Sequence, residues 1–242
     1  MPSTAEIARL DEAIAATWPA TESQELDGWR LRFGHGFTGK ANSAWPRSHD
    51  GSVPVAHKIA AVEAWYRSRA LRPKVQLSPA SEPADLEEEL AARGYARSTD
   101  VLIETLDSAP DLGVSSDVEV LPEPDERWLD VWFAVRGYPR SEAPRVLPML
   151  GGDAVFARID DVAVGRAAAY GDRVAITSMA TLPEARRRGC ARSILAVLAA
   201  WACERNAALC LAVEATNEPA RALYENVGFA PVYSYWYRTA TA

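Results

Sequence analysis

The chain has 242 residues, of which 24% are charged and 48% are hydrophobic, and its net charge is −7 at pH 7. This length is enough for one large domain or two small ones with a buried core. The negative charge argues against nonspecific nucleic-acid binding, which needs a basic surface.

Cysteine and histidine usage argues against a disulfide framework and against a metal site. The three cysteines, Cys190, Cys203 and Cys210, cannot all pair, and there is no C-x-x-C motif. The three histidines all lie in the first half of the chain without ligand spacing. No signal-peptide pattern and no apolar run of about 18 residues occurs. We therefore expect a cytoplasmic protein without a metal or membrane contacts.

The first half of the chain alternates between helical and strand patterns, separated by Gly- and Pro-containing turns. The predicted elements are a helix over 7–18 behind a Ser3 or Thr4 cap, a hairpin with strands over 29–33 and 37–45, a helix over 59–66, a strand over 74–78, a helix over 85–93 and a strand over 99–106. Residues 108–116 have the composition of a linker. They divide the chain into predicted domains over 1–107 and 117–242.

The second half repeats this alternation with longer strands. The predicted elements are a strand over 118–121, helices over 125–136 and 141–150, antiparallel strands over 154–159, 163–170 and 173–181, a helix over 191–204, a strand over 208–214, a helix over 219–227 and a strand over 232–238. Trp128 and Trp132 lie one turn apart on a predicted helix. Such a pair is more typical of a core than of a pocket.

The order of elements in the two halves indicates an internal duplication. The pair Gly94-Tyr95 and the pair Gly228-Phe229 each follow a predicted helix, and they are separated by 134 residues. The same shift places Leu77 on Leu211. A duplicated domain is the simplest explanation.

Residues 179–192 form the stretch with the clearest chemical signal. Pro183 ends a strand because it has no amide hydrogen for the ladder, and Gly189 permits a close turn before a helix that starts near residue 191. A helix N-terminus presents unpaired amides and a partial positive charge, which suit a phosphate. The stretch adds four arginines, Arg186, Arg187, Arg188 and Arg192.

The stretch lacks the motifs of the common nucleotide-binding loops. There is no G-x-x-x-x-G-K-[ST] and no G-x-G-x-x-G, so ATP and NAD both fit poorly. Two other interpretations of the arginines are a solvated basic face and a nucleic-acid patch. Cys190 near the helix start has no histidine nearby in sequence to act as its base, so packing is its expected role.

The remaining pattern resembles the GNAT superfamily of N-acetyltransferases. Arg186, Gly189 and Ala191 form R-x-x-G-x-A after a strand ending in Leu-Pro, which is similar to the family's acyl-CoA loop. Residues 217–229 are similar to a second family signature, N-x-x-A-x-x-L-Y-x-x-x-G-F. The resemblance covers roughly residues 118–242.

The resemblance implies an α/β (α+β) fold of two tandem GNAT-like domains, each a mixed, largely antiparallel sheet flanked by helices. Domain 117–242 would be catalytic. In domain 1–107 the positions that match the loop hold Ser52, Val55 and His57 in place of arginine, glycine and a small residue. We therefore expect this domain to be degenerate, to pack against the catalytic domain and to wall its substrate pocket.

The resemblance also implies which residues bind acetyl-CoA, the acyl donor. The strand before the loop would splay from the strand over 208–214, and its free backbone groups would hold the pantetheine arm and polarise the thioester carbonyl. Backbone amides and guanidinium groups would take the diphosphate. The residues so implied are Met179, Ala180, Thr181, Arg186, Arg187, Arg188, Gly189, Cys190, Ala191, Arg192 and Asn217.

Two residues are candidates for catalysis. Tyr224 matches the family tyrosine that can protonate the departing thiolate, although it could also only pack one helix face. Glu214, at the end of a strand, is the candidate general base. Asn217 is expected to cap the helix that follows it as well. The segment 136–138 lies where the resemblance implies contact with the acceptor.

The expected function is transfer of an acetyl group from acetyl-CoA to a primary amine of a small molecule or peptide. The main alternative is a protein that senses acyl-CoA without turning it over. A nucleic-acid module is a third possibility, although the net charge disfavours it. We expect either a monomer in which the two copies form an internal pseudo-dimer, or a homodimer.

Overall fold

The computed structural model describes residues 2–108, 112–113 and 117–241, and its contacts group the chain into two compact units. Unit 1 comprises Met1–Leu102, Glu214–Thr216 and Val232–Ala242, and unit 2 comprises Ile103–Val213 and Asn217–Pro231. Most of the linker predicted over 108–116 lies outside the described residues. The predicted domain limits at 107 and 117 therefore stay a prediction.

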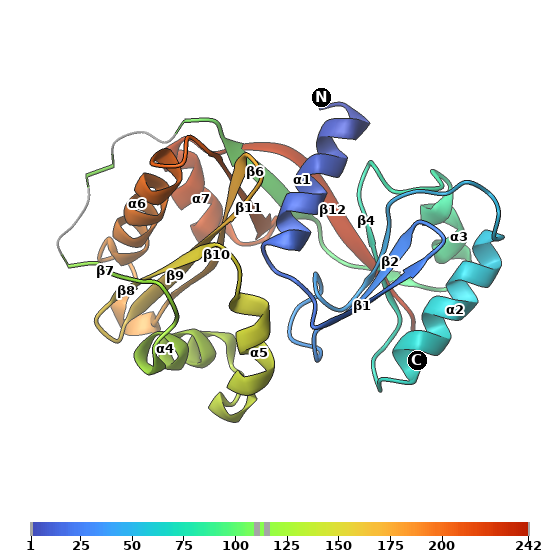
Figure 1. Cartoon of the computed structure of the whole chain (residues 1–242), viewed down its shortest axis with the longest axis horizontal. Helices are drawn as coiled ribbons and strands as arrows, with labels where there is room; N and C mark the ends of the chain where they lie inside the picture. Colours follow the sequence, from blue (N-terminus) through green and yellow to red (C-terminus); the bar gives the residue numbers. More distant parts are fainter. Residues whose placement is uncertain (1, 109–111, 114–116, 242) are drawn as a thin grey trace. The chain divides into compact units, whose positions relative to one another are not determined.

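Unit 1 is a mixed sheet with three helices (Figure 1). Its strands follow the order β1-β2-β3-β4-β12, and β5 also pairs with β12. The elements are α1 (Thr4–Ala16), β1 (Glu22–Leu26), β2 (Trp29–Phe33), β3 (Ala44–Pro46), α2 (Val55–Arg67), β4 (Lys74–Leu77), α3 (Leu86–Ala92), β5 (Ala96–Arg97) and most of β12 (Ala230–Thr239).

The first helix shows how local sequence sets an element. Ser3 and Glu6 form a capping box, in which each side chain accepts a hydrogen bond of 3.3 Å from the other's backbone N–H. Ile7, Leu10 and Ile14 follow at helical spacing, and all three are buried. The predicted helix and its Ser3 cap are confirmed, with the helix starting three residues earlier than expected.

The predicted hairpin of 29–33 with 37–45 is confirmed only at the end of its second strand, where β3 pairs antiparallel with β2, and a strand before β2 was missed. β2 instead forms a tight hairpin with β1, and the turn residues Asp27 and Gly28 have φ of +45° and +79°. On its other side β2 pairs with β3, which is only three residues long. β1 was missed because its sequence, ESQEL, is polar and mostly exposed and so carries no apolar alternation.

Unit 2 is a second mixed sheet, with strand order β7-β8-β9-β10-β11-β6. Neighbouring strands from β7 to β10 pair antiparallel, whereas β10 and β11 pair parallel. The elements are the last part of β6 (Val101–Leu106), β7 (Glu119–Leu121), α4 (Glu126–Arg136), the 3₁₀ turn η1 (Arg140–Glu142), α5 (Ala143–Leu150), β8 (Ala154–Ile159), β9 (Ala163–Tyr170), β10 (Arg173–Thr181), the 3₁₀ turn η2 (Pro183–Ala185), α6 (Cys190–Cys203), β11 (Ala208–Glu214) and α7 (Glu218–Val227).

The central strand of unit 2 is covered on both faces. Six consecutive residues of β9, from 163 to 168, are buried, which requires packing on either side of the sheet. Figure 1 shows α6 on one side of these strands and α4 on the other. Trp128 and Trp132 of α4 are 0% and 1% exposed, and the Trp128 indole N–H donates to the Gly165 carbonyl oxygen at 3.2 Å. Their predicted core role is confirmed.

Four consecutive stretches of the two halves correspond at the predicted offset. Shifted by 134 residues, α2 covers 189–201 against α6 at 190–203, and α3 covers 220–226 against α7 at 218–227. The strand β4 falls within β11 in the same way, and the β5–β6 segment falls on β12. The repetition inferred from the sequence is therefore present in the order and the approximate positions of these elements.

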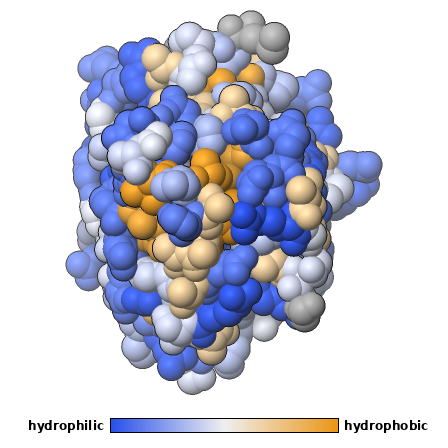
Figure 2. Space-filling model, turned by 90° about the vertical axis from the view of Figure 1, so that its right-hand side faces the viewer, coloured by the Kyte–Doolittle hydropathy of each residue, from blue (hydrophilic) through white to orange (hydrophobic). Residues whose placement is uncertain are grey.

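The surface of the described chain offers no membrane-spanning element. None of the helices in the described ranges combines the length and the apolar composition needed to cross a bilayer. The face drawn in Figure 2 is mostly hydrophilic, with a hydrophobic area near its centre. Isolated hydrophobic areas of this kind are normal on folded proteins.

The buried tryptophan of α4 gives a test of the unit 2 core. Trp128→Ala removes a fully buried side chain and leaves the Gly165 carbonyl without its indole donor. We expect the free energy of unfolding to fall by about 3–5 kcal/mol. Urea denaturation followed by circular dichroism measures it. As a control, Val120→Ala at a position 53% exposed should change stability by less than about 0.5 kcal/mol. A loss below about 1 kcal/mol for Trp128→Ala would contradict this packing.

Candidate active site

The central feature of the candidate site is a parting of two parallel strands. β10 and β11 pair from Arg173↔Ala208 to Ile176↔Leu211, and no pair follows although both strands continue through described residues to Thr181 and Glu214. On its other side β10 stays paired with β9 up to Thr181. The segment 179–181 therefore has no ladder partner on the β11 side, as the family resemblance implied, while binding of the acyl donor there stays a prediction.

A β-bulge in β10 marks the point where the strands part. The register of β10 on β9 shifts between Thr177 and Ala180, and Ser178 has φ of +55°. A bulge bends its strand and increases the local twist. The bend accounts for the loss of pairing with β11 while pairing with β9 continues. Beyond the bulge, β10 has no ladder partner on the β11 side.

The loop after β10 presents a row of unpaired backbone donors. Arg187 and Gly189 have φ of +63° and +85°, and a Cβ placed on Gly189 would meet no atom within 4 Å. Within the described chain, none of the N–H groups from residue 187 to 192 donates a hydrogen bond. Together with the positive end of the α6 dipole they form an anion-binding concavity.

The arginines of this loop are free of carboxylate partners. All four are exposed, and none forms an ion pair with any described residue. The Arg186 Nε donates to the Thr181 carbonyl oxygen at 3.3 Å, which ties the loop back to the end of β10. By contrast, Arg140 and Arg158 of the same unit each pair with acidic side chains. Unpaired guanidinium groups beside free amides favour a phosphorylated ligand.

Close packing fixes the start of α6 against the sheet. A Cβ on Gly165 of β9 would lie 2.5 Å from Ile194 Cγ2 and 2.6 Å from Met179 Sδ. Only glycine permits this approach between the strand, α6 and the bulged part of β10. The half-buried Cys190 donates its thiol to the Ala185 carbonyl oxygen at 3.8 Å. The loop therefore sits on a rigid scaffold.

Tyr224 lies on α7 with its phenol buried. Asn217 caps this helix by accepting from the Ala220 N–H at 3.3 Å, as predicted, and Gly228 ends it with φ of +107°. Tyr224 is 7% exposed and packs edge-on against Phe229, with 5.8 Å between ring centroids. Its hydroxyl forms no hydrogen bond with the described residues. Contact of Asn217 with the acyl donor stays a prediction.

Burial holds the proton of Tyr224 firmly. Burial, with a smaller contribution from the Glu104 carboxylate, raises the pKa of Tyr224 to about 12, while Arg136 acts in the opposite direction. The phenol is therefore protonated at neutral pH. Arg136, from the segment predicted to contact the acceptor, is thus placed in the electrostatic neighbourhood of Tyr224.

Two further observations concern the carboxylates. The predicted base Glu214 is the last residue of β11 and is exposed, so its role stays a prediction.

Glu104 of β6 is 4% exposed, and the sequence analysis did not identify it as a candidate. The sequence contained a sign of this buried carboxylate, because a charged residue interrupts the largely apolar strand V-L-I-E-T-L. The prediction assigned that strand to the other domain.

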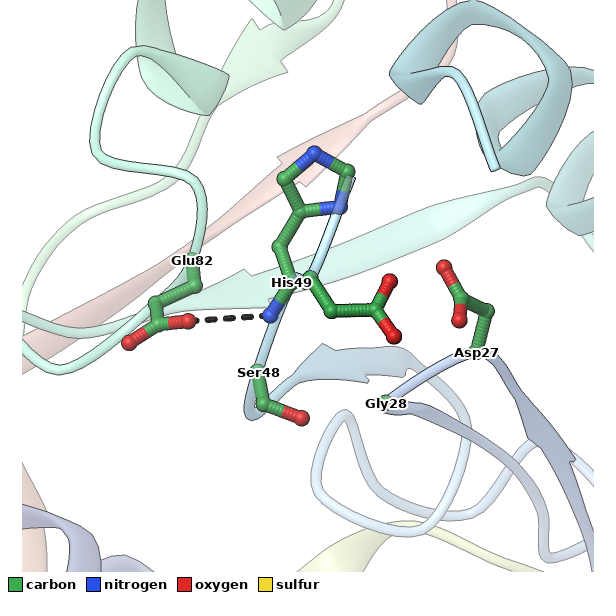
Figure 3. Close-up of a pocket in the computed structure, with 6 residues that line it drawn as sticks. Asp27, Gly28, Ser48, His49 and Glu82 are labelled. Carbon is green, nitrogen blue, oxygen red and sulfur yellow. Dashed lines mark hydrogen bonds between the residues drawn. The ribbon is translucent and has the colours of Figure 1, made fainter. Parts of the chain in front are cut away.

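A small hollow lies elsewhere, in unit 1, between the β1–β2 turn and the loop after β3 (Figure 3). Its volume is about 160 Å³, too small for a coenzyme, since ligand pockets usually exceed about 300 Å³. Its charged groups satisfy one another: the buried Lys58 Nζ lies 2.6 Å from Asp27 Oδ2 and 3.0 Å from His49 Nδ1. Glu82 accepts the His49 backbone N–H at 2.9 Å. This hollow is a structural cluster.

Unit 1 shows none of the loop chemistry of unit 2. Its corresponding helix α2 begins after Pro54, which provides no side-chain cap, and its first turn carries no arginine. Across the described ranges no group of three or more His, Cys, Asp or Glu side chains is arranged to hold a metal ion. The unpaired amides and the arginines of the loop before α6 therefore lie in unit 2, whereas Glu214 belongs to unit 1.

Comparison with known proteins agrees with this geometry. The family model described as "Probable histone acetyltransferase Rv0428c C-terminal" matches residues 4–238. The chain is 34% identical over 215 residues to the Mycobacterium tuberculosis protein named "Probable histone acetyltransferase Rv0428c", covering 84% of this chain but only 64% of that protein. It is 24% identical over 246 residues to the "Uncharacterized N-acetyltransferase YobR" of Bacillus subtilis, covering 96% and 98% of the two chains.

Solved structures show the same fold. A GCN5-related N-acetyltransferase from Kribbella flavida superposes with a TM-score of 0.70 at 15% identity, covering 97% of this chain and 95% of that one. A tandem GNAT protein from the clavulanic acid biosynthesis pathway gives 0.61 at 15% identity, covering 100% and 89%. The predicted fold class is confirmed. The chain belongs to the family described by the matching family model, the Rv0428c C-terminal family, and spans less than two thirds of the length of the M. tuberculosis relative.

Proposed function

We propose that this protein transfers an acetyl group from acetyl-CoA to a primary amine of a small molecule or peptide. The observation that carries the proposal is the parting of β10 and β11 next to the unpaired amides and guanidinium groups at the start of α6. One end of this arrangement suits a diphosphate, and the other suits an extended, amide-containing chain. An acyl thioester of coenzyme A has both parts.

The chain's own residues have distinct tasks in this proposal. The amides of 187–192 receive the diphosphate, and Arg186, Arg188 or Arg192 reach its oxygens. Those peptide groups of 179–181 that have no strand partner on the β11 side orient the pantetheine arm and polarise the thioester carbonyl. The amine then attacks that carbonyl, so that a C–N bond forms, the C–S bond breaks and the thiolate needs a proton. Tyr224 supplies the proton.

A non-catalytic sensor of acyl-CoA is the alternative that uses the same site. It predicts tight binding of coenzyme A without release of free thiol from acetyl-CoA. The proposed transferase predicts thiol release that depends on an added amine. A screen of small amines, antibiotics, amino acids and peptide N-termini addresses the acceptor. Because one relative's name refers to histones, lysine side chains of basic proteins belong in that screen.

The loop is tested by removing its positive charge. In the double variant Arg186→Ala/Arg188→Ala we expect the Kd for coenzyme A, measured by calorimetry, to rise about tenfold or more, because two charge-assisted contacts are lost. Added salt should weaken wild-type binding more than binding by the variant. Arg205→Ala, which removes an exposed arginine at the far end of α6, should leave the Kd unchanged. Equal affinities for all three proteins would remove the loop from the proposal.

The acid role is tested by Tyr224→Phe, which keeps the ring and its packing on Phe229 but removes the proton. We expect kcat to fall about 100-fold, within the range for a lost general acid, with the Kd for coenzyme A unchanged. Thiol release in steady state gives kcat. Tyr170→Phe, at a residue 47% exposed, should behave as wild type. Equal turnover of Tyr224→Phe and wild type would show that Tyr224 only packs.

A further inference from the structure

Glu104 is a buried carboxylate that neither hydrogen-bonds nor forms an ion pair with a residue that the structure describes. It lies on β6 and is 4% exposed, and its Oε2 is shielded from solvent with no hydrogen-bond donor. The carboxylate forms no hydrogen bond and no ion pair within the described chain. Buried acidic groups are normally paired, since an isolated charge is costly to remove from water. An unpaired one therefore calls for a ligand or a chemical role.

Packing places Glu104 opposite the turn of α7 that carries Tyr224. Leu106, two residues further along β6, points to the same face of the strand as Glu104. Its Cδ1 lies 3.5 Å from the position of a Cβ on Gly228, at the end of α7. Tyr224 lies one turn before Gly228 on that helix. The carboxylate and the phenol are therefore neighbours in unit 2.

The groups that face Glu104 do not neutralise it. Arg221 and Glu225, on either side of Tyr224 in α7, act on the carboxylate with opposite signs, and Arg136 of α4 acts on Tyr224. Arg221, Glu225 and Arg136 are all exposed. The Tyr224 hydroxyl is also without a hydrogen bond among the described residues. The Glu104 carboxylate and the Tyr224 hydroxyl thus interact electrostatically, and each has unused hydrogen-bonding capacity among the described residues.

We propose that Glu104 binds the ammonium group of the acceptor, accepts its proton and passes that proton towards Tyr224. This inference rests on the proposed acetyltransferase function and deepens it. It assigns a catalytic role to a strand from the first half of the chain. It also specifies the acceptor as an amine that is a cation in solution, because only a cation pairs with the buried carboxylate.

The proton balance closes without any further reactant. One ammonium proton moves to Glu104, and the neutral amine attacks the thioester carbonyl. The C–S bond breaks, the thiolate takes the Tyr224 proton, and the phenolate recovers a proton from Glu104. The second nitrogen proton leaves to solvent as the amide forms. One ammonium and one thioester therefore give one amide, one thiol and one free proton.

The electrostatics couple the two groups in the required direction. Burial raises the pKa of Glu104 above its usual value, with Arg221 opposing, so the group accepts a proton readily. The Glu104 charge in turn helps to raise the pKa of Tyr224. Protonation of Glu104 removes that charge, so Tyr224 becomes a stronger acid when the thiolate departs. The base form of Glu104 exists only above its raised pKa, so activity should rise with pH through that value.

The test compares matched glutamate variants with n-butylamine and acetyl-CoA as probes. Thiol release is measured from pH 6 to 10 for wild type, Glu104→Gln, Glu214→Gln and Glu204→Gln, the last an exposed control at the end of α6. We expect Glu104→Gln to lose about 100-fold in kcat/KM for the amine at pH 7. The loss should shrink towards pH 10, where the amine approaches its own pKa of about 10.4 and enters already neutral. Glu204→Gln should match wild type.

A second experiment measures binding of an ammonium ion to the wild-type protein. It therefore depends neither on turnover nor on correct folding of a variant. The ¹³C signals of labelled glutamate side chains are titrated in wild type, and the signal lost or moved in Glu104→Gln or Glu104→Asp identifies Glu104. Adding n-butylammonium chloride should lower the apparent pKa of Glu104, since a bound cation stabilises the charged form. The neutral n-butanol should leave it unchanged.

Several results would overturn the inference without touching the proposed function. One is a loss in Glu104→Gln that is the same at every pH, which indicates a structural role. Another is the pH-dependent loss occurring in Glu214→Gln instead, which assigns the base to Glu214. A third is a Glu104 signal that does not respond to the ammonium ion. Absence of thiol release by wild type with every amine would instead count against the proposed function.

Discussion

The parting of β10 from β11 is the constraint on which the site depends. A parallel ladder that continued beyond Ile176 and Leu211 would satisfy every peptide group with another strand and leave none for a ligand. The bulge at Ser178 ends that ladder while β9 keeps β10 in the sheet. The chain then turns directly into α6, so free strand groups and free helix amides follow one another within a few residues. Gly165 holds this arrangement by letting α6 approach the sheet closely.

Charge is distributed unevenly over this framework. The chain as a whole is acidic, with a net charge of −7, yet four arginines beside the α6 N-terminus pair with no carboxylate among the residues that the structure describes. Around Tyr224 of α7 the opposite situation holds, because this buried phenol lies near the buried carboxylate of Glu104, which forms no ion pair with a described residue. A positive, exposed region suits an anionic donor. A negative, buried one suits a cationic acceptor, and both lie in unit 2.

Those parts of the fold that depend on local sequence patterns could be predicted from the sequence. Four strands were predicted with the correct bounds, over 154–159, 163–170, 173–181 and 208–214. In each of them, either polar and apolar residues alternate between two clear turn signals or the residues form a continuous apolar run. The polar edge strand β1 gave no such signal. Glu104 could not be connected with Tyr224, because 120 residues separate them and pairing of distant strands leaves no trace in one sequence. The two units also do not coincide with the two halves of the sequence, because residues 103–106 belong to unit 2 and residues 232–242 belong to unit 1.

The most direct test of the central claim is the amide ¹H–¹⁵N spectrum of the protein titrated with coenzyme A. If main-chain donors at the start of α6 receive the diphosphate, the amide signals of residues 187–192 should shift most. Those of 179–181 should shift with the same saturation curve. A titration that reports binding while the signals of 187–192 stay in place would contradict the claim.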